Sequence, residues 1–242
     1  MVSYLKIGHM DIPVKIIQEW RASTRVALGK DHVILRIPKI VFRNQLDKHV
    51  QWAENWLKQI QSQKPQALLR YISVRTYQHE DNITIGGKTF ILHLEYHEKK
   101  IATIKLLDQN VLCISIPSTS GVDRQKVIKH VLSRFFCKFL LPLLRQRVVY
   151  FNDTYFNQKF QDIRLKYNKS NWGSCSRNRN LNFSVRLFLA PPEVLDYVIV
   201  HELAHLLEMN HSKKFWRIVE NVMPDYKKYE KLLKTNSYQY DF

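Results

Sequence analysis

Residues 201–205 of this 242-residue chain read His201-Glu202-Leu203-Ala204-His205, and a third histidine, His211, follows soon after. A helix turns by ~100° per residue, so positions four apart lie one above the other on the same face. His201 and His205 can therefore direct their imidazoles at one metal ion. Glu202 lies beside the first of them, where its carboxylate can reach a water on that ion. A catalytic zinc has three protein ligands and an open position, so the pattern predicts a zinc site with Glu202 as general base.

His211 completes this site only if the helix ends before it. Continued helix would rotate the chain by ~600° between His205 and His211, and would leave His211 roughly 120° away from the first two histidines. Asn210 tolerates the left-handed conformation used at helix ends, and Ser212 can cap a new helix. We therefore expect a chain break at Asn210, His211 as third ligand and one zinc ion per chain. A gluzincin-like site with Glu220 as third ligand is the main rival geometry.

The residues around the motif predict a buried helix. Pro191-Pro192-Glu193 suits its first turn, because proline needs no helical N–H there and a glutamate complements the helix dipole. Buried His and Glu side chains need partners, and a metal ion satisfies all of them together. Two incidental histidines on a surface helix are the alternative. The apolar positions that argue against it are Val198, Ile199, Val200, Leu203, Ala204, Leu206 and Leu207.

Two predicted strands, residues 162–167 and 181–189, lead into this helix, with turn-forming residues between them. An extended substrate can add to an exposed strand edge beside the metal, although both strands can equally be ordinary members of a sheet. Candidate substrate-binding residues are Trp172, Asn182 and Arg186. Candidates for stabilising the oxyanion of the tetrahedral intermediate are Arg186, Tyr226 and Tyr229, for which packing or a surface position is the commoner role.

The N-terminal half contains two similar runs of strands followed by a helix. In the first, residues 14–20, 25–28 and 33–37 are predicted strands, and residues 44–61 a helix. In the second, residues 84–94 (with a turn at Gly86-Gly87), 101–107 and 111–116 precede a helix over residues 123–148. The second helix has two adjacent apolar rows, which indicate a face turned to the core. A constant offset matches Thr24, Leu28, Ile37 and Pro38 with Thr103, Leu107, Ile116 and Pro117, a faint internal repeat.

Composition bounds the class of protein. Apolar content of 45% with 12% aromatic residues indicates a globular chain, and no apolar run reaches membrane-spanning length. Three widely spaced cysteines and no signal peptide predict a cytoplasmic protein. Cys175 can be a ligand or a reactive thiol, but a buried structural cysteine is the commoner role.

The net charge of +17 is concentrated in one part of the chain. From Arg124 to Arg186 there are fourteen Lys or Arg residues against two acids, Asp153 and Asp162. This stretch predicts an acidic partner such as nucleic acid, while a merely soluble basic surface is an equal alternative. A DNA-associated zinc protein, either a protease acting on DNA-bound proteins or a non-catalytic binding protein, is therefore the alternative function.

Several motifs standing in order carry a resemblance to a known family. They are Trp172-Gly173-Ser174-Cys175-Ser176, Asn180-Leu181-Asn182, the run from Ala190 to Val198, His201-Glu202-Leu203-Ala204-His205, Asn210-His211-Ser212, Phe215-Trp216 and Pro224-Asp225-Tyr226. Together they resemble the YgjP-like zinc metallopeptidases, relatives of SprT-type proteins. The likeness is dense from residue 162 to 233 and faint in the N-terminal half.

The resemblance implies an α+β fold in which a minimal zincin-like metallopeptidase domain, residues 121–242, follows a β-rich N-terminal region, residues 1–120. It implies zinc on His201, His205 and His211, Glu202 as general base, and a peptide or protein substrate. One departure is visible, because Asn171 stands where the family usually has an arginine. Lys169 and Arg177 are the nearest basic residues that can replace it.

Overall fold

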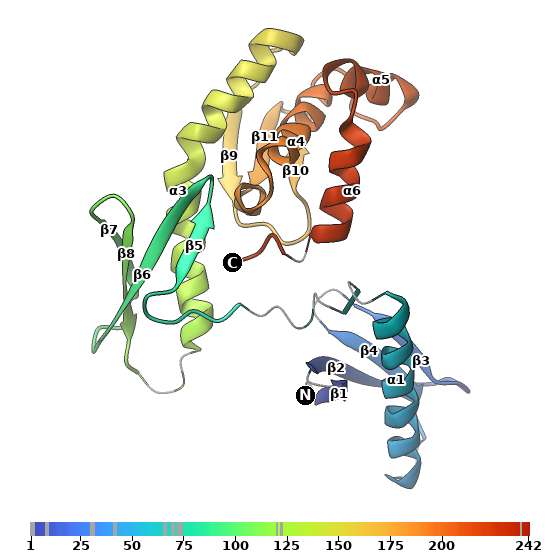
Figure 1. Ribbon diagram of the computed structural model, residues 1–242. Helices are drawn as coiled ribbons and strands as arrows, with labels where there is room; N and C mark the ends of the chain where they lie inside the picture. The colour runs from blue at the N-terminus through green and yellow to red at the C-terminus, as the bar shows by residue number, and fades with distance from the viewer. Residues whose placement is uncertain are drawn as a thin grey trace. The chain divides into compact units, whose positions relative to one another are not determined.

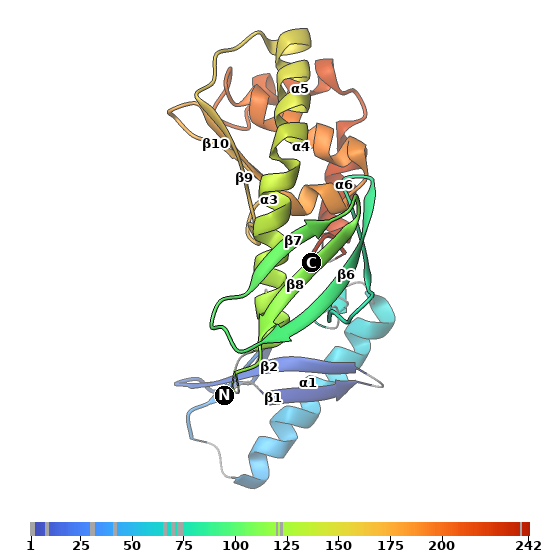
Figure 2. The same ribbon diagram turned by 90° about the vertical axis from the view of Figure 1, so that its left-hand side faces the viewer.

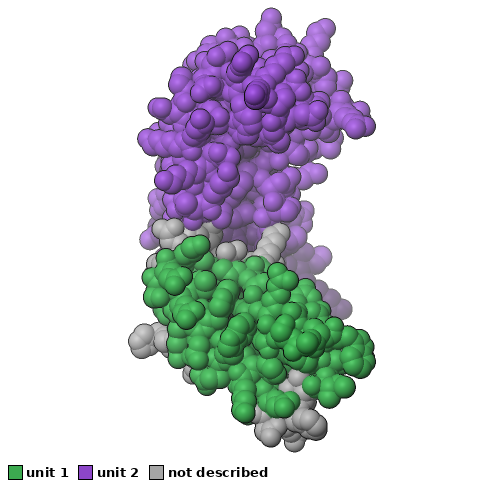
Figure 3. Space-filling view, turned by 90° about the vertical axis from the view of Figure 1, so that its right-hand side faces the viewer, with its two compact units in different colours: residues 1–74 green, residues 75–242 purple. Residues whose placement is uncertain are grey.

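The computed structural model describes residues 3–7, 10–29, 32–40, 43–64, 67–68, 71, 75–119, 121, 123–237 and 239–242. The chain divides into two compact units, residues 1–74 and residues 75–242 (Figures 1 and 3). Between the predicted strands 25–28 and 33–37 the sequence Gly29-Lys30-Asp31 predicts a turn, but residues 30 and 31 lie outside the described residues.

Unit 1 is a four-stranded sheet covered by one helix. The elements are β1 (Ser3–Ile7), β2 (Met10–Glu19), β3 (Arg25–Leu28), β4 (Val33–Pro38) and α1 (Arg43–Gln63), and the strand order is β1-β2-β4-β3. Strands β2 and β4 are parallel, and the outer strands are antiparallel to them. Alternate strand residues are buried against α1, as the period of two requires. The core residues are Leu5, Ile7, Ile12, Val14, Val33, Leu35, Ile37, Ala53, Leu57, Leu68 and Tyr71.

Unit 2 begins with a sheet of the same design. It comprises β5 (Asn82–Ile85), β6 (Lys88–His97), β7 (Thr103–Leu107) and β8 (Val111–Pro117), in the order β5-β6-β8-β7, with β6 and β8 parallel and the outer strands antiparallel. Helix α3 (Arg124–Phe151) follows and lies against one face of the sheet (Figure 2). Its first turn is capped by Asp123, whose carboxylate accepts from the Lys126 N–H.

The two sheets share their strand order and their buried positions, and their registers correct the expected alignment along one strand. Ile37 and Ile116 remain equivalent, as the constant offset required. Leu28 pairs with Val33, however, and the equivalent pairing in unit 2 joins Leu106 to Leu112. The equivalent of Leu28 is therefore Leu106, not Leu107. Along the same strands Arg25 pairs with Arg36 and Thr103 with Ser115, so the equivalent of Thr103 is Arg25, not Thr24. Buried equivalent pairs are Leu5 and Ile83, Ile7 and Ile85, Ile12 and Phe90, Val14 and Leu92, Val33 and Leu112, Leu35 and Ile114, and Ile37 and Ile116.

The remainder of unit 2 packs on the far side of α3. Strands β9 (Asp162–Lys166), β10 (Gly173–Cys175) and β11 (Asn180–Ser184) form a sheet ordered β10-β11-β9. Helices α4 (Pro192–Ala204), α5 (Lys213–Val222) and α6 (Tyr226–Asn236) complete the unit. The strand expected over residues 181–189 ends at Ser184, and a 3-10 helix, η2 (Val185–Leu189), replaces its second half. Apolar residues alternate with Asn182, Ser184 and Arg186 along this stretch, as in a strand, but Val185 to Phe188 are buried on both faces, and this tertiary packing overrides the alternation.

Helix α3 belongs to a single core that includes both sheets of unit 2 and the active-site helix. A short π-helix, η1 (Asn152–Phe156), continues it toward β9. The chain therefore divides between Val74 and Arg75, and not at the expected boundary between residues 120 and 121. The physical reason is that β5–β8 bury their apolar face against α3, so this sheet cannot be separated from the rest of unit 2.

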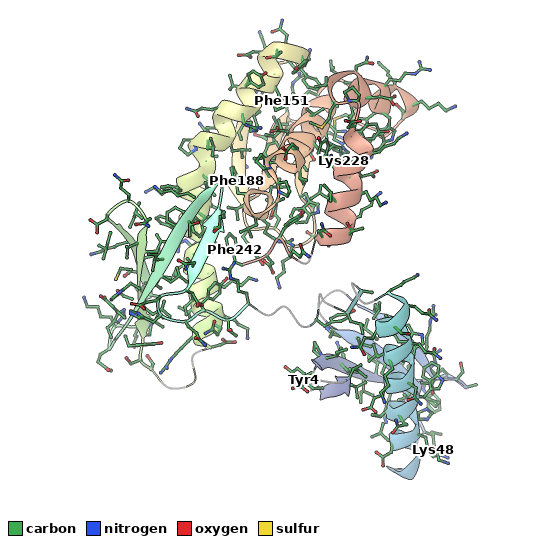
Figure 4. All side chains as sticks on the ribbon, in the orientation of Figure 1. Tyr4, Lys48, Phe151, Phe188, Lys228 and Phe242 are labelled. Carbon is green, nitrogen blue, oxygen red and sulfur yellow. The ribbon has the colours of Figure 1, made fainter. Side chains whose placement is uncertain are left out.

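The fold is α+β, with α4, the helix that carries His201, beside the small β10-β11-β9 sheet, as the sequence predicts. Within the described part of the chain, no helix combines the length and the apolarity needed to cross a membrane. The last residues of the chain also belong to the core of unit 2: Phe242 is buried there and stacks on Phe136 of α3 (Figure 4).

Candidate metal centre and active site

Helix α4 presents His201 from its last turn and ends earlier than the sequence predicts. It stops at Ala204, and tight main-chain bonds such as Leu206 N–H to Leu203 O close the last turn. Asn210 is not among the described residues with positive φ, so the expected left-handed break at this residue is wrong. The prediction that Ser212 caps the next helix is confirmed, since its hydroxyl accepts from the Phe215 N–H at 3.3 Å. The chain thus reverses between the two helices.

This reversal brings three histidines together. The Nε2 atoms of His201 and His211 are 3.0 Å apart, and His205 offers a ring nitrogen within 4.8 Å of the others. Glu220, the rival third ligand, is exposed on α5 and is not part of this cluster. A metal ion held by the described residues would thus meet three imidazoles, a donor set that suits zinc.

The protonation of the histidines fits a metal. Burial, together with the neighbouring imidazoles of His205 and His211, lowers the pKa of His201 to about 3. Burial also lowers the pKa of His205. Nδ1 of His205 lies 3.1 Å from the Glu208 carbonyl, so it carries the proton and leaves the Nε2 lone pair free. The Nε2 atoms of His201 and His211 are close enough to share a proton as an N–H···N hydrogen bond or to bind one metal ion together, and the three imidazoles form a donor set that fits a metal ion.

Aromatic side chains of α5 and α6 back the histidines. The ring of Phe215 is fully buried and lies 4.5 Å from His205, while Trp216 stacks on His211 at 5.7 Å. Tyr226 is buried and stacks on Trp216 at 5.2 Å. Its ring is thus a packing element, and Tyr229 contributes to the same core. Neither tyrosine lines the cavity beside His201 and Glu202.

Glu202 is the buried carboxyl group of the site. Burial raises its pKa to about 8, although a hydrogen bond from the main-chain N–H of Cys175 opposes this shift. Its Oε2 atom is buried without a hydrogen-bond partner among the described residues. A buried carboxyl oxygen without a partner is costly, and it suits a group that works on a bound water or substrate.

Gly173 of β10 makes room for this carboxyl group. A Cβ at this position would lie 2.5 Å from Oε1 of Glu202 and 2.7 Å from its Cγ, so a larger residue would displace the side chain. The sequence alone gives Gly173 no role beyond its place in a motif. The only feature of the sequence that could have indicated this role is the presence of a glycine between Trp172 and Ser174 in a predicted turn.

Cys175 is not part of the histidine cluster. Burial and the nearby Glu202 carboxyl raise the pKa of its thiol to about 11. A protonated thiol is a poor ligand and a poor nucleophile, so the structure favours the structural role. Its contribution to the site is its main-chain N–H.

A cavity of about 380 Å³ opens beside His201 and Glu202. Strand β10 and helices α4 and α6 form its walls, and the side chains of Glu230 and Lys234 in α6 pair at 2.7 Å. Trp172 lies in the wall, as a substrate-contacting residue must. The lining residues are Trp172, Gly173, Tyr197, Val198, His201, Glu202, Glu230, Leu233, Lys234 and Ser237.

The other two expected substrate residues brace the cavity instead. Arg186 is buried, and its guanidinium donates to the carbonyls of Tyr240, Ser237 and Asn168 while lying 4.4 Å from the Trp172 ring. Its donors are thus directed at the main chain and not at the cavity. This arrangement also removes Arg186 from the candidates for the oxyanion.

Asn182 and Asn171 have similar bracing roles in the hairpin. Asn182 of β11 donates to the Ser174 hydroxyl at 3.3 Å across the strand pair and does not line the cavity. Asn171, which replaces the arginine usual in the family, donates to the Gly173 carbonyl at 3.3 Å. Its amide therefore supports the turn that carries Gly173.

Two solved structures are similar to parts of the chain. The metallopeptidase zymogen of Pyrococcus abyssi abylysin has a TM-score of 0.35 and 24% identity, covering 38% of this chain and 92% of its own. The metallopeptidase zymogen of Methanocaldococcus jannaschii jannalysin has a TM-score of 0.34 and 23% identity, covering 38% and 94%. No curated protein matches the chain.

A model of the YgjP-like metallopeptidase domain matches residues 22–236, well beyond the motif-rich region and into unit 1. The three-histidine cluster and the buried glutamate lie within this match. The chain therefore belongs to the YgjP-like metallopeptidase family and is a zinc metallopeptidase.

Proposed function

We propose that this protein hydrolyses peptide bonds at one zinc ion held by His201, His205 and His211, with Glu202 as the general base. The observation that carries the proposal is the convergence of three ring nitrogens within 4.8 Å beside a buried carboxyl group with an unpartnered oxygen. When bound, the zinc ion supplies a Lewis acid that polarises a carbonyl and acidifies a water.

The chain's own residues prepare the site for this chemistry. His205 keeps its proton on Nδ1, toward the Glu208 carbonyl, and His201 is neutral over the whole physiological range. Both present lone pairs without first losing a proton. The aromatic residues Phe215 and Trp216 exclude water from behind the ligands and hold their rings in one orientation.

Glu202 takes the proton of the attacking water and delivers it to the leaving amine. Its burial favours the neutral acid, which suits the second of these steps, and the Cys175 N–H favours the carboxylate, which suits the first. Gly173 lets the carboxyl group lie directly against β10. The base is thereby held next to the strand along which a substrate can bind.

We propose that the substrate binds in an extended form along β10. This strand is at the edge of the β10-β11-β9 sheet, and Trp172 and Gly173, at its start, line the cavity. Main-chain hydrogen bonds of an added strand would fix the scissile bond beside Glu202, and Trp172 would contact a substrate side chain. Asn182 and Arg186 support this wall from behind.

The test is metal analysis combined with cleavage of a broad peptide library by the purified full chain. Glu202→Gln should keep its zinc and lose hydrolysis by about a thousandfold, because a general base contributes on the order of 10²–10⁴ to the rate. Glu193→Gln, an exposed glutamate in the first turn of the same helix, is the matched control and should keep both. Unchanged hydrolysis in Glu202→Gln would remove Glu202, and with it this mechanism.

We propose a cytoplasmic location, because Cys113, Cys137 and Cys175 are all free thiols. A second candidate function is action near nucleic acid, favoured by the fourteen basic residues against two acids from Arg124 to Arg186. Real phosphate contacts give a steep dependence of affinity on salt, so a DNA titration at several salt concentrations tests it. An absence of binding at low salt would dismiss this candidate.

A further inference from the structure

Strand β7 is an edge strand whose inner face continues into an open groove. It pairs only with β8 among the strands of its sheet, so its other side has unpaired main-chain groups (Figure 2). Ile104 and Leu106 lie opposite the buried Ile114 and Leu112, and therefore face α3. An edge of this kind can accept a further strand.

The groove lies between β7 and α3 and encloses about 610 Å³. Phe135 and Phe139, on successive turns of α3, stack at 5.5 Å, and Phe139 remains 37% exposed. These rings form an apolar floor that the fold of the described residues does not cover. The lining residues are Ala102, Ile104, Val131, Arg134, Phe135, Lys138 and Phe139.

The charged residues of the groove are all basic. Arg134 and Lys138 occupy successive turns of α3 and have no ion pair with any described residue, and no carboxylate lines the groove. Lys88 adds a third cation, with its Nζ 5.8 Å from the centre of the Phe139 ring. A row of cations beside an apolar row is complementary to an extended segment whose inward-facing side chains, every second residue, are acidic and apolar in turn.

We propose that this groove binds an extended acidic peptide segment of another protein, which adds as a strand to the free edge of β7. Every second side chain of the segment faces α3; among these inward positions, apolar side chains cover Phe135 and Phe139, and carboxylates pair with Arg134 and Lys138. Main-chain bonds to β7 supply affinity, and the two rows of α3 supply selectivity.

The groove favours a peptide over single-stranded nucleic acid. Phe135 and Phe139 stack on each other at an interplanar angle of 16°, and Phe90 packs edge-on against both. Their faces are therefore largely used within the protein, whereas bases need free aromatic faces. A strand edge, in contrast, offers nothing specific to a phosphate backbone.

The test is a fluorescence anisotropy titration of the full chain with a labelled synthetic peptide of roughly ten residues, a strand's length, in which every second residue is in turn a glutamate or an apolar residue and the residues between are threonines. A peptide of the same composition with its apolar residues in one block, and one with lysines replacing the glutamates, are the comparison probes. We expect the alternating acidic peptide to bind at least about tenfold more tightly than either, because pattern and charge both matter.

The decisive variant is Arg134→Glu with Lys138→Glu, which should weaken binding by about tenfold or more. Its matched control is Lys227→Glu with Lys231→Glu, an exposed pair at the same spacing on α6, which should bind as the wild type does. Hydrogen exchange should slow in residues 102–108 when the alternating peptide binds. Equal losses in both double variants, or unchanged exchange at β7, would overturn the proposal. So would displacement of the peptide by a single-stranded oligonucleotide through the same two residues.

Discussion

The sheet of β1–β4 with α1 and the sheet of β5–β8 with α3 have the same strand order and equivalent buried positions, yet their helices differ. Helix α1 buries one face, with Ala53 and Leu57 at its centre, and leaves Trp52 exposed. Helix α3 is longer and packs in a core that extends from β5–β8 to β9–β11 and α4. Helix α3 therefore has a second apolar face, and this face allows β9–β11 and α4 to pack on it.

The elements that pack on α3 include the candidate metal centre, and a side chain of α3 is bonded to the helix that carries His201. Arg147 of α3 binds Asp196 of the active-site helix through two hydrogen bonds, which keep the pKa of Arg147 above its usual range. The bonds join α3 to α4 about one and a half turns before His201. Unit 1 is thus a sheet with one helix packed on it. In unit 2, the equivalent sheet and helix also pack against the elements that carry the candidate site.

The largest expected effect comes from paired core substitutions at equivalent positions. Leu35→Ala and Ile114→Ala each remove a fully buried side chain, and each should lower the free energy of unfolding of its own unit by about 3 kcal/mol. Only Ile114→Ala should speed hydrogen exchange in residues 193–204, because only β8 shares a core with α4. Equal acceleration there by Leu35→Ala would erase the distinction between the units.

A smaller effect is expected at the point where β10 meets Glu202, the proposed general base. Gly173→Ala should lower kcat by about 10- to 100-fold with zinc retained, because the added Cβ displaces Glu202 from its working position. Gly87→Ala is the matched control in the β5–β6 turn. Its Cβ meets nothing within 4 Å and φ is +76°, so it should cost about 1 kcal/mol of stability and leave kcat unchanged. Equal kcat in both variants would mean that the contact with Glu202 has no role.

The smallest effect concerns an anchor in unit 2 at the end of the described chain. Burial alone would raise the pKa of Asp241, but hydrogen bonds from Lys129 and Tyr167 outweigh it and lower this pKa below its usual value. A carboxylate with a lowered pKa stabilises the fold above the unfolded pKa of about 4, and this stability is lost as pH falls through the folded value. Asp241→Asn should thus cost about 1–2 kcal/mol at pH 7.

Chemical denaturation from about pH 7 down to about pH 2 checks this prediction. The difference between Asp241→Asn and the wild type should shrink steadily as the solution becomes more acidic. A difference that is constant with pH would show that the carboxylate's charge does not matter. Gln239→Glu is the control: it exchanges an amide and a carboxyl group of the same size as Asp241→Asn does, at an exposed residue near the same end of the chain.

The elements could be predicted wherever the pattern was periodic. The two apolar rows of α3 and the alternation in β4 and β8 identify a helix and two strands without further knowledge. The single strand expected over residues 181–189 was wrong in its second half, because the alternation continues past Ser184 while the buried packing of residues 185–189 favours a 3-10 helix. The domain boundary was also misplaced, since the packing of β5–β8 against α3 is a tertiary contact that no local pattern reports.

The sequence predicted the candidate ligands of the site, but it did not predict which residues hold the site in place. Spacing alone indicates that His201 and His205 share a face, and the capping role of Ser212 indicates a reversal of the chain. The position of the break was wrong, because the end of α4 is set by the bond between His205 and the Glu208 carbonyl and not by a left-handed Asn210. The bracing role of Arg186 depends on the carbonyls of Ser237 and Tyr240, far away in the chain, and no sequence pattern reports such contacts.

The most direct test of the three-histidine site is the zinc content of His211→Ala beside that of Glu220→Ala, measured on the purified full chain together with peptide hydrolysis. If His211 is the third ligand, His211→Ala should lose most of its zinc and all measurable hydrolysis, while Glu220→Ala should keep about one zinc per chain and its activity. Stoichiometric zinc retained in His211→Ala, with zinc lost from Glu220→Ala, would contradict the account.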